Sequence, residues 1–437
     1  MTNDTTHGAT GITRRELIKT ASLASLATAF PGGLFAAGAS ERIRVGLVGC
    51  GGRGTGAAID CATASPDVVI SALADVFPDQ LEWAKGRLKE KLTADRLALT
   101  PETCYSGFDA YKKVLAAPVD LVILAAPPCF RPAHLAAAVE AGKHVFTEKP
   151  VAVDPTGVRS VIATSELAGR KGIAIVAGTQ RRHQAHYLEI MKRVRAGDIG
   201  ELVAGQCYWN MGALWVERAS QNWANRSAKK WSDMEWQVRN WLFTAWASGD
   251  HIVEQHVHNL DVMNWAFGAH PVKCSGMGGR ATRTDPMYGN IFDHFAVEYE
   301  YPNGARVLSM CRQTAGAAEN VSERVVGASG FSYTDSVDGY IKGGRPYENE
   351  AASPNPYVQE HVDLIASIKA GTPLNEGRQV AESTLTAIMG RMSAYTGRAL
   401  GWDWVMNASK LDLTPPHMEW KDLPPLEVAV PGQTPLV

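Results

Sequence analysis

The sequence predicts an α/β protein in which a doubly wound parallel sheet is followed by an α+β domain built on a second sheet. In the first half of the chain, short β-branched runs alternate with helical stretches, which is the pattern of βαβ units. After about residue 180, strands alternate apolar with polar residues, which is typical of an antiparallel or mixed sheet. The length of 437 residues also exceeds that of one ordinary core, so two domains are expected.

The first 39 residues differ from the rest of the chain. Arg14 and Arg15 precede a run of small and apolar residues at 20–35, and Ala-Gly-Ala follows at 37–39. A twin arginine, a short apolar stretch and a small-x-small site are together typical of a twin-arginine export signal. A basic tail or membrane anchor is the alternative, but the stretch is short and interrupted for a hydrocarbon core of about 30 Å. We therefore expect the twin-arginine machinery as a partner, a periplasmic or otherwise exported location, and no stable membrane span.

The predicted N-terminal domain spans residues 40–179. Its strands are continuous apolar runs, which indicates strands that are buried on both faces of a parallel sheet. The strands are expected at 42–49, 68–75, 119–126, 144–147 and 172–177. The helices between them are expected at 80–91, 132–141 and 155–169.

The predicted C-terminal domain spans residues 180–437. Its clearest strands are expected at 203–209, 292–301 and 305–312. Asn303-Gly304 joins the last two of these runs, and Asn-Gly in that position is a strong hairpin signal. A long helix is expected at 377–397.

A glycine-rich loop follows the first predicted strand. It has the GxGxxG spacing and reads Gly49-Cys50-Gly51-Gly52-Arg53-Gly54. The glycines allow a tight turn, close approach of backbone amides to a pyrophosphate, and close helix–strand packing. Asp75 ends the next strand, where it would accept hydrogen bonds from the adenosine ribose and repel a 2′-phosphate. The predicted cofactor is therefore NAD, although Arg44 and Arg53 keep NADP open.

Further motifs follow the glycine loop at a recognisable spacing. They are Ala125-Ala126-Pro127-Pro128, His134, Thr147-Glu148-Lys149-Pro150, and later Glu254, His258, Asp261, Trp265 and Gly268. With these motifs the mature chain resembles the glucose–fructose oxidoreductase, inositol 2-dehydrogenase and rhizopine catabolism (Gfo/Idh/MocA) family. The resemblance implies an N-terminal Rossmann domain and a C-terminal α+β domain with a large open mixed sheet. It also implies hydride transfer between a nicotinamide and a sugar, polyol or related carbon.

The same resemblance implies roles for individual residues. Lys149 would lie beside the nicotinamide and hydrogen-bond the reacting oxygen, and His258 would accept the proton during oxidation. Glu148 would contact the nicotinamide-side ribose. Family members usually carry Asp where this chain has Glu254, so this longer side chain is expected to contact either the histidine or the substrate. The implied cofactor-binding set is Gly49, Gly51, Gly52, Arg53, Gly54, Asp75, Ala126, Pro127, His134 and Glu148.

The spacing of the histidine segment agrees with that chemistry. On one helix, Glu254, His258 and Asp261 would fall at i, i+4 and i+7 and share a face. A carboxylate beside an imidazole would orient it as a general base, and a lysine would stabilise developing alkoxide charge. His251 and His256 suggest a metal site with His258, but residues two apart on a helix point in different directions, so no metal is predicted. His251 and His256 are instead candidates for substrate contacts, with core packing as the alternative.

Several other side chains are candidates for substrate contacts. Arg182, His183 and Tyr187 follow the last predicted parallel strand, where the chain should cross into the second domain. Ion pairing within the fold is the alternative role for them. Trp241 and Trp246 offer ring faces for a pyranose, and core packing is their alternative.

Composition excludes some classes of partner. The net charge is −2 and there is no basic stripe, which argues against nucleic acid. The seven cysteines are scattered without a CxxC pair, which predicts mostly buried free thiols. The leading interpretation is an exported NAD-dependent oxidoreductase of a sugar-like substrate. A redox-neutral, NAD-using glycosidase and a non-enzymatic binding protein are the alternatives, and a homo-oligomer stays open.

Overall fold

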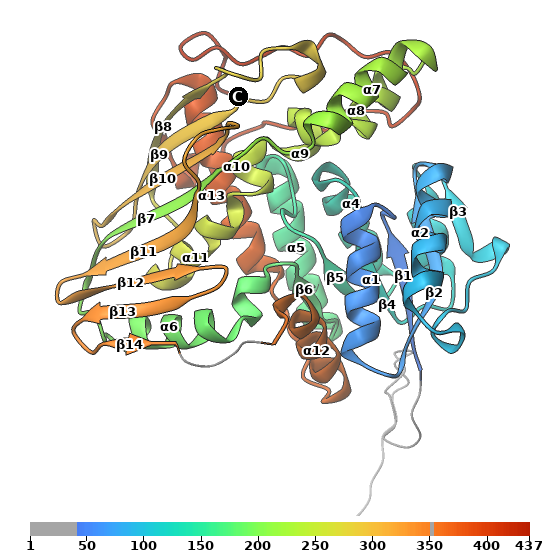
Figure 1. Cartoon of the computed structure of the whole chain (residues 1–437), viewed down its shortest axis with the longest axis horizontal. Coiled ribbons are helices and arrows are strands. Elements are labelled where there is room, and N and C mark those ends of the chain that lie inside the picture. Colours follow the sequence, from blue (N-terminus) through green and yellow to red (C-terminus); the bar gives the residue numbers. More distant parts are fainter. Residues whose placement is uncertain (1–41, 350–353) are drawn as a thin grey trace, which may run out of the picture. The chain divides into compact units, whose positions relative to one another are not determined.

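The computed structural model describes residues 42–349 and 354–437 (Figure 1). The predicted export signal at residues 1–39 therefore lies outside the described residues. The described residues form one compact unit, which contains two β-sheets.

The first sheet is the predicted doubly wound parallel sheet. Its strands lie in the order β3-β2-β1-β4-β5-β6, and all neighbouring pairs are parallel. The strands are β1 Ile43–Val48, β2 Val68–Asp75, β3 Cys104–Ser106, β4 Leu121–Leu124, β5 His144–Thr147 and β6 Ile175–Ala177. The order reverses between β1 and β4, and ligands of doubly wound sheets bind at the carboxyl ends of the strands beside such a reversal.

Helices cover both faces of this sheet. One face packs against α1, α2 and α12, and the other against α3, α4 and α5. The bounds are α1 Gly52–Ala64, α2 Pro78–Lys91, α3 Ala110–Ala116, α4 Arg131–Glu140, α5 Pro155–Lys171 and α12 Pro356–Lys369. Leu364 and Ile365 of α12 join the core beneath α1, so a segment from late in the chain completes the first layer. We propose that the continuous N-terminal part of this domain ends at residue 179.

The second sheet is mixed and has nine strands. Its order is β14-β13-β12-β11-β7-β10-β9-β8-β15, with β10 parallel to β7 and antiparallel to β9. The strands are β7 Leu202–Met211, β8 Lys273–Gly279, β9 His294–Glu300, β10 Arg306–Gln313, β11 Asn320–Gly327, β12 Gly330–Asp335, β13 Gly339–Gly343, β14 Tyr347–Glu348 and β15 Leu400–Gly401. The predicted Asn-Gly hairpin is confirmed as the turn between β9 and β10.

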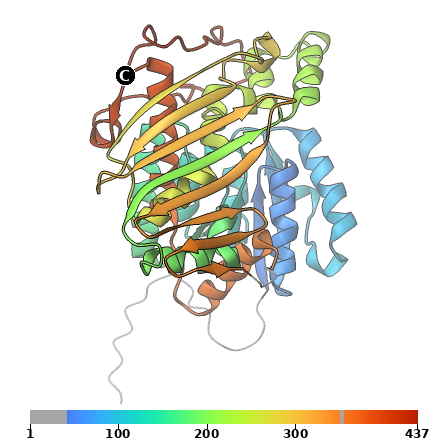
Figure 2. The ribbon, with the colours of Figure 1, turned by 60° about the vertical axis from the view of Figure 1, so that its left-hand side comes forward.

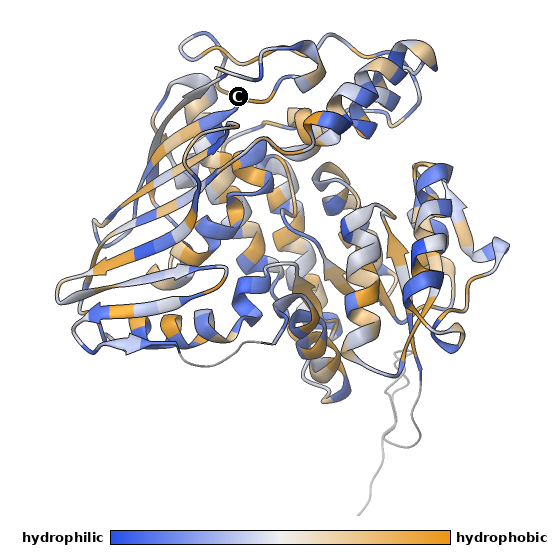
Figure 3. Ribbon diagram, in the orientation of Figure 1, coloured by the Kyte–Doolittle hydropathy of each residue, from blue (hydrophilic) through white to orange (hydrophobic). Residues whose placement is uncertain are grey.

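The two faces of the second sheet differ. Figure 2 shows one face without a helix over it, whereas α6, α11 and α13 pack against the other. Figure 3 shows the resulting alternation of polar and apolar residues along these strands. The remaining helices are α6 Ala185–Arg195, α7 Val216–Ala228, α8 Asp233–Arg239, α9 Ala245–Ser248, α10 His251–Glu254, α11 Val257–Phe267, α13 Gly377–Thr396 and α14 Trp402–Asn407.

Two further predictions can be compared with these elements. The long helix predicted at 377–397 is α13, which also packs against α5. The cysteines are free, and all but Cys104 are buried, as predicted. Among residues 42–349 and 354–437, no helix has both the length and the apolar character needed to cross a bilayer.

Candidate active site

The glycine-rich loop connects β1 to α1 at the carboxyl end of the first sheet. Gly49 has φ = 97°, and a side chain there would collide with the backbone of Ala126. A side chain on Gly54 would collide with the carbonyl oxygen of Gly49, so only glycine allows this helix–strand contact. Gly51 and Gly52, in contrast, face open space, and no side chain caps the N-terminus of α1. The loop therefore presents backbone amides and a helix N-terminus to an anion.

A cavity of about 1020 Å³ lies over this loop. One wall comes from the strand ends of the first sheet, and another comes from α7 and α8. Nine of the ten predicted cofactor residues line it: Gly49, Gly51, Gly52, Arg53, Gly54, Asp75, Ala126, Pro127 and His134. Ligand pockets commonly enclose about 300–1,000 Å³, so the cavity has room for a dinucleotide. Its size, the glycine turn and the uncapped helix together fit NAD.

Asp75 lies at the wall of the cavity in the predicted ribose-recognition position. Its Oδ2 accepts a hydrogen bond from the amide of Cys50 at 2.7 Å, and its Oδ1 accepts one from the amide of Phe77 at 2.9 Å. Burial raises the pKa of this carboxyl, while the two backbone donors oppose the rise. The side chain is thus fixed in place by the glycine loop and by the start of the next turn.

Glu148 is the predicted cofactor residue that does not line the cavity. Its Oε1 lies 2.5 Å from Nε of Arg53. Burial raises the pKa of Glu148, but the charges of Arg53 and Lys149 outweigh burial and lower it. Arg44 pairs with Asp120 at 2.8 Å. The two arginines that kept NADP open therefore both form ion pairs with carboxylates.

Lys149 follows β5 and reaches across to α10. Its Nζ donates to the backbone oxygen of Glu254 at 2.6 Å and lies 3.3 Å from the Oε1 of that residue. The two side chains are only 13% and 14% exposed. A cis peptide bond joins Lys149 to Pro150, whose carbonyl accepts a hydrogen bond from Arg131 at 2.5 Å. The Lys149–Glu254 pair therefore joins the end of β5 in the first sheet to α10.

His258 lies in α11, and the prediction that it shares one helix with Glu254 is wrong. α10 ends at Glu254, and α11 begins at residue 257. The carboxylate of Glu254 contacts Lys149, while Nδ1 of His258 is buried without a hydrogen-bond partner. The ring stacks on Trp209 with centroids 5.8 Å apart. Burial, followed by the charges of Lys149 and Arg181, lowers the pKa of His258 well below its ordinary value, so the imidazole is neutral.

For Arg182 and Tyr187 the structure favours the alternative role, contacts within the fold. Arg182 forms a two-pronged ion pair with Asp261, with N···O distances of 2.7 and 2.9 Å. Tyr187 is fully buried and donates to Glu323 at 2.9 Å. Buried charges and hydroxyls require such partners, which explains why these side chains are already occupied.

His183 and His256 are likewise held within the fold. Nδ1 of His183 lies 2.6 Å from Asp363, and its Nε2 lies 3.3 Å from Glu376. Burial disfavours the charged ring, but the two carboxylates outweigh burial and raise the pKa of His183 to about 10. His256 is fully buried, with its Nε2 2.7 Å from the hydroxyl of Ser309. Packing is therefore the role that the structure favours for His256.

The two tryptophans have different surroundings. Trp241 lines the dinucleotide cavity, with its ring edge-on to Trp215 at 5.6 Å. Trp246 is buried and donates to Gln237 at 2.6 Å, which matches core packing. Neither ring is part of the Lys149–Glu254 contact.

Arg131, which no sequence motif indicated, is a cation within electrostatic range of Glu148 and Glu254. Arg131 opens α4 and is 4% exposed. Burial lowers its pKa to about 10, and the charges of Glu148 and Glu254 oppose that change. Its position between the Pro-Pro motif and His134 was visible in the sequence, but nothing there indicated that it is buried.

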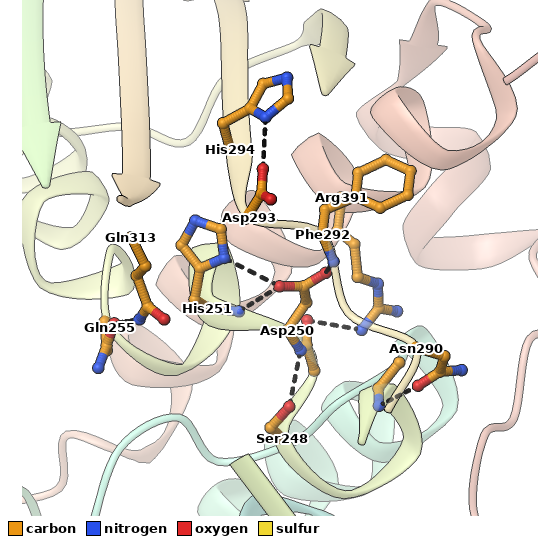
Figure 4. A network of polar contacts seen from close by, with 12 residues as sticks. Ser248, Asp250, His251, Gln255, Asn290, Phe292, Asp293, His294, Gln313 and Arg391 are labelled. Atoms are coloured by element: carbon orange, nitrogen blue, oxygen red, sulfur yellow. Dashed lines mark hydrogen bonds and ion pairs between the residues drawn. The ribbon is translucent and has the colours of Figure 1, made fainter. Parts of the chain in front are cut away.

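Asp250 is a second residue that no sequence motif indicated, and it lies at the centre of a polar network just before Glu254 in the chain (Figure 4). It is fully buried with φ = 70°, a conformation that costs a non-glycine residue roughly 1–3 kcal/mol. Its carboxylate accepts hydrogen bonds from the amide of His251 at 2.6 Å, the amide of Phe292 at 2.7 Å and the hydroxyl of Tyr395 at 2.6 Å. These bonds fix α10 against β9 and α13.

Two family models match the chain. The first, described as an oxidoreductase family with an NAD-binding Rossmann fold (GFO_IDH_MocA), matches residues 43–193. The second, described as the GFO/IDH/MocA C-terminal domain, matches residues 187–331. Together the two matches run from residue 43 to residue 331, which is more than half of the chain.

The individual proteins that resemble the chain have low sequence identity or match only part of it. Inositol 2-dehydrogenase 4 of Saccharopolyspora erythraea is 31% identical over 168 residues, which are 38% of this chain and 45% of that protein. A glycosyl hydrolase family 109 protein of Shewanella amazonensis is 29% identical over 237 residues, 49% of this chain and 50% of that protein. The chain thus spans about half the length of these curated relatives. The crystal structure of aldose-aldose oxidoreductase from Caulobacter crescentus, complexed with glycerol, shares the fold with a TM-score of 0.64 at 19% identity. The alignment covers 83% of this chain and 100% of that one.

Proposed function

Since the chain belongs to the Gfo/Idh/MocA family of oxidoreductases with an NAD-binding Rossmann domain, we propose that it oxidises or reduces a carbon of a sugar, glycoside or polyol with NAD. Similarity to an inositol 2-dehydrogenase supports a polyhydroxylated substrate. The observation that carries the proposal is the contact of Lys149 with Glu254 at the end of β5, within electrostatic range of His258.

We assign each residue at this contact a role in the reaction. When bound, NAD supplies the electrophilic ring carbon that takes a hydride from the substrate. Nζ of Lys149 would donate a hydrogen bond to the reacting oxygen and stabilise the negative charge that develops there. The neutral ring of His258 would accept the hydroxyl proton. In this arrangement Glu254 positions Lys149 and does not orient the histidine.

The proposal includes export. Arg14 and Arg15, the apolar run after them and the Ala-Gly-Ala site support a twin-arginine signal. An enzyme that leaves the cytoplasm with its nucleotide must retain that nucleotide, because the periplasm does not replace it. The association of copies into a homo-oligomer also remains a proposal.

A second candidate function is redox-neutral cleavage of a glycoside with the same cofactor. The similarity to a glycosyl hydrolase family 109 protein favours it. Glu148-Lys149-Pro150 and His258 favour the oxidoreductase, because these motifs carry the resemblance to the dehydrogenases.

One assay separates the two. The purified protein is incubated with excess NAD and a panel of free sugars, polyols and aryl glycosides, while NADH absorbance and aryl release are followed together. If the proposal is correct, NADH accumulates in proportion to a ketone or lactone product, and the NADH absorbance is lost in Lys149→Ala. Release of the aryl group over many turnovers, without lasting NADH, would replace the proposal by the glycosidase.

A further inference from the structure

Helix α7 forms a wall of the dinucleotide cavity that the nucleotide motifs do not account for. Gln221 of α7 lines the cavity, and so do four further polar side chains: Arg218, Asn222 and Asn225 of α7, and Lys229, which follows its last residue. Their spacing of four, three and four positions places them along one side of the helix. We call these four residues the α7 face.

The α7 face is cationic. Arg218 and Lys229 carry positive charges, and Asn225 adds a neutral amide donor. The amide of Asn222 donates to the backbone oxygen of Arg239 at 3.1 Å and so ties α7 to the end of α8. Within α7, which the structure describes in full, no acidic side chain lines the cavity. The glycine loop on the other wall offers backbone amides, so cations and amides would approach a bound diphosphate from two sides.

The charge of Arg218 lies within electrostatic range of Asp75. Asp75 occupies the ribose-recognition position, so this part of α7 lies over the adenosine half of the cavity. The residues that line the cavity also include Phe77 and Phe108, which give it an apolar wall.

A second set of contacts fastens α8 to the start of α2. Arg239 donates to the two carboxylate oxygens of Asp79 at 3.0 and 3.2 Å. Its guanidinium also lies 3.8 Å from the ring centre of Phe77 and 4.8 Å from that of Trp231. The Asp79 side chain is 58% exposed, so the ion pair itself is a surface contact, and the two rings hold the Arg239 guanidinium in place beside it. The wall that α7 and α8 form is therefore anchored where the adenosine half would lie.

The C-terminal tail adds another contact in the same place. The ring of Trp420 stacks on Phe77 at 5.4 Å and lies 4.4 Å from Phe108. The backbone oxygen of Lys421 accepts a hydrogen bond from Met234 at the start of α8. The tail thus packs on the outside of the aromatic residues that line the adenosine end.

We propose that the α7 face binds the adenosine-diphosphate half of NAD, and that the Arg239–Asp79 contact slows release of the nucleotide by holding α8 closed over it. The inference rests on NAD as the cofactor and not on the chemistry at Lys149. It explains how an exported enzyme would retain its nucleotide.

Binding of ADP-ribose, which lacks the nicotinamide, tests the first part. Affinity is measured by isothermal titration calorimetry on the protein without its export signal, after charcoal has removed any bound nucleotide. Arg218→Gln and Lys229→Gln should each weaken ADP-ribose binding about tenfold, because each removes a charge-assisted contact. Lys192→Gln is the matched control, since its side chain is 75% exposed on α6, outside the cavity. A variant that carries both substitutions is also measured. If it binds ADP-ribose as tightly as wild type, and circular dichroism shows that its fold is intact, the assignment is overturned.

The release rate of NADH tests the second part. Trp215, Trp231 and Trp241 line the cavity, so bound NADH should quench their emission by energy transfer. Asp79→Asn should speed the recovery of that emission by about two- to fivefold after excess NAD is added, because an exposed ion pair contributes up to about 1 kcal/mol. An unchanged rate would show that the contact does not limit release. If wild-type protein binds ADP-ribose but converts no sugar, the proposed function fails while this inference stands.

Discussion

Replacing His183 by glutamine should destabilise the protein strongly at low pH and weakly at high pH. The ring of His183 is 5% exposed and lies between Asp363 at 2.6 Å and Glu376 at 3.3 Å. Its pKa is about 10 in the folded protein, against about 6.5 for an exposed histidine. At about 1.4 kcal/mol per pH unit between these values, the charged ring contributes at most about 5 kcal/mol. Because Asp363 is about one-third exposed, we expect about 3 kcal/mol.

The direction of the pH dependence follows from the raised pKa. The stabilisation is fully present below the unfolded pKa of about 6.5 and is lost as the pH rises toward the folded pKa of about 10. Denaturant unfolding of wild type and His183→Gln at about pH 6 and about pH 9.5 measures it, with tryptophan fluorescence as the signal. His270→Gln is the control, because His270 forms no ion pair among the described residues. An equal penalty at both pH values would refute the reasoning. A raised KM with unchanged stability would make His183 a substrate contact instead.

The remaining predictions concern the cofactor, the chemistry and export. Lys149→Ala and His258→Ala should each lower kcat by about two orders of magnitude while NAD affinity changes little, as measured by steady-state kinetics beside a binding titration. An unimpaired His258→Ala enzyme would place the base elsewhere. Wild type should bind NAD more tightly than NADP, and Asp75→Asn should reduce that preference about tenfold, since it removes the charge that repels a 2′-phosphate. Tighter NADP binding by wild type would contradict this role of Asp75. Replacing Arg14 and Arg15 by lysine should leave the precursor in the cytoplasm on cell fractionation, and undiminished export would exclude the twin-arginine route.

Features that depend on local chemistry could be predicted from the sequence. The glycine loop is one, because a side chain at Gly54 would collide with the carbonyl oxygen of Gly49 in the same loop. The hairpin at Asn303-Gly304 is another, since its geometry follows from the turn residues themselves. The parallel sheet follows from the alternation of apolar runs with helices.

Features that depend on distant partners could not be predicted in the same way. The spacing of Glu254 and His258 fits one helix, but α10 ends at Glu254 and α11 begins at Val257. The start of α10 is held by a bond from Phe292 to Asp250, 42 positions away. His183 meets a carboxylate 180 positions away, which no local pattern indicates. The wall formed by α7 has a polar face without a sequence motif, and only its position over the glycine loop connects it with the nucleotide.

The most direct test of the central claim follows the hydrogen atom that leaves the substrate carbon. A polyol or sugar found active in the panel is labelled with deuterium at the oxidised carbon and incubated with the protein and NAD. The proposed function predicts NADH that is one mass unit heavier, with the label on the nicotinamide ring, and no such product with Lys149→Ala. Unlabelled NADH, or deuterium released to solvent while the substrate is consumed, would contradict hydride transfer between the substrate carbon and the cofactor.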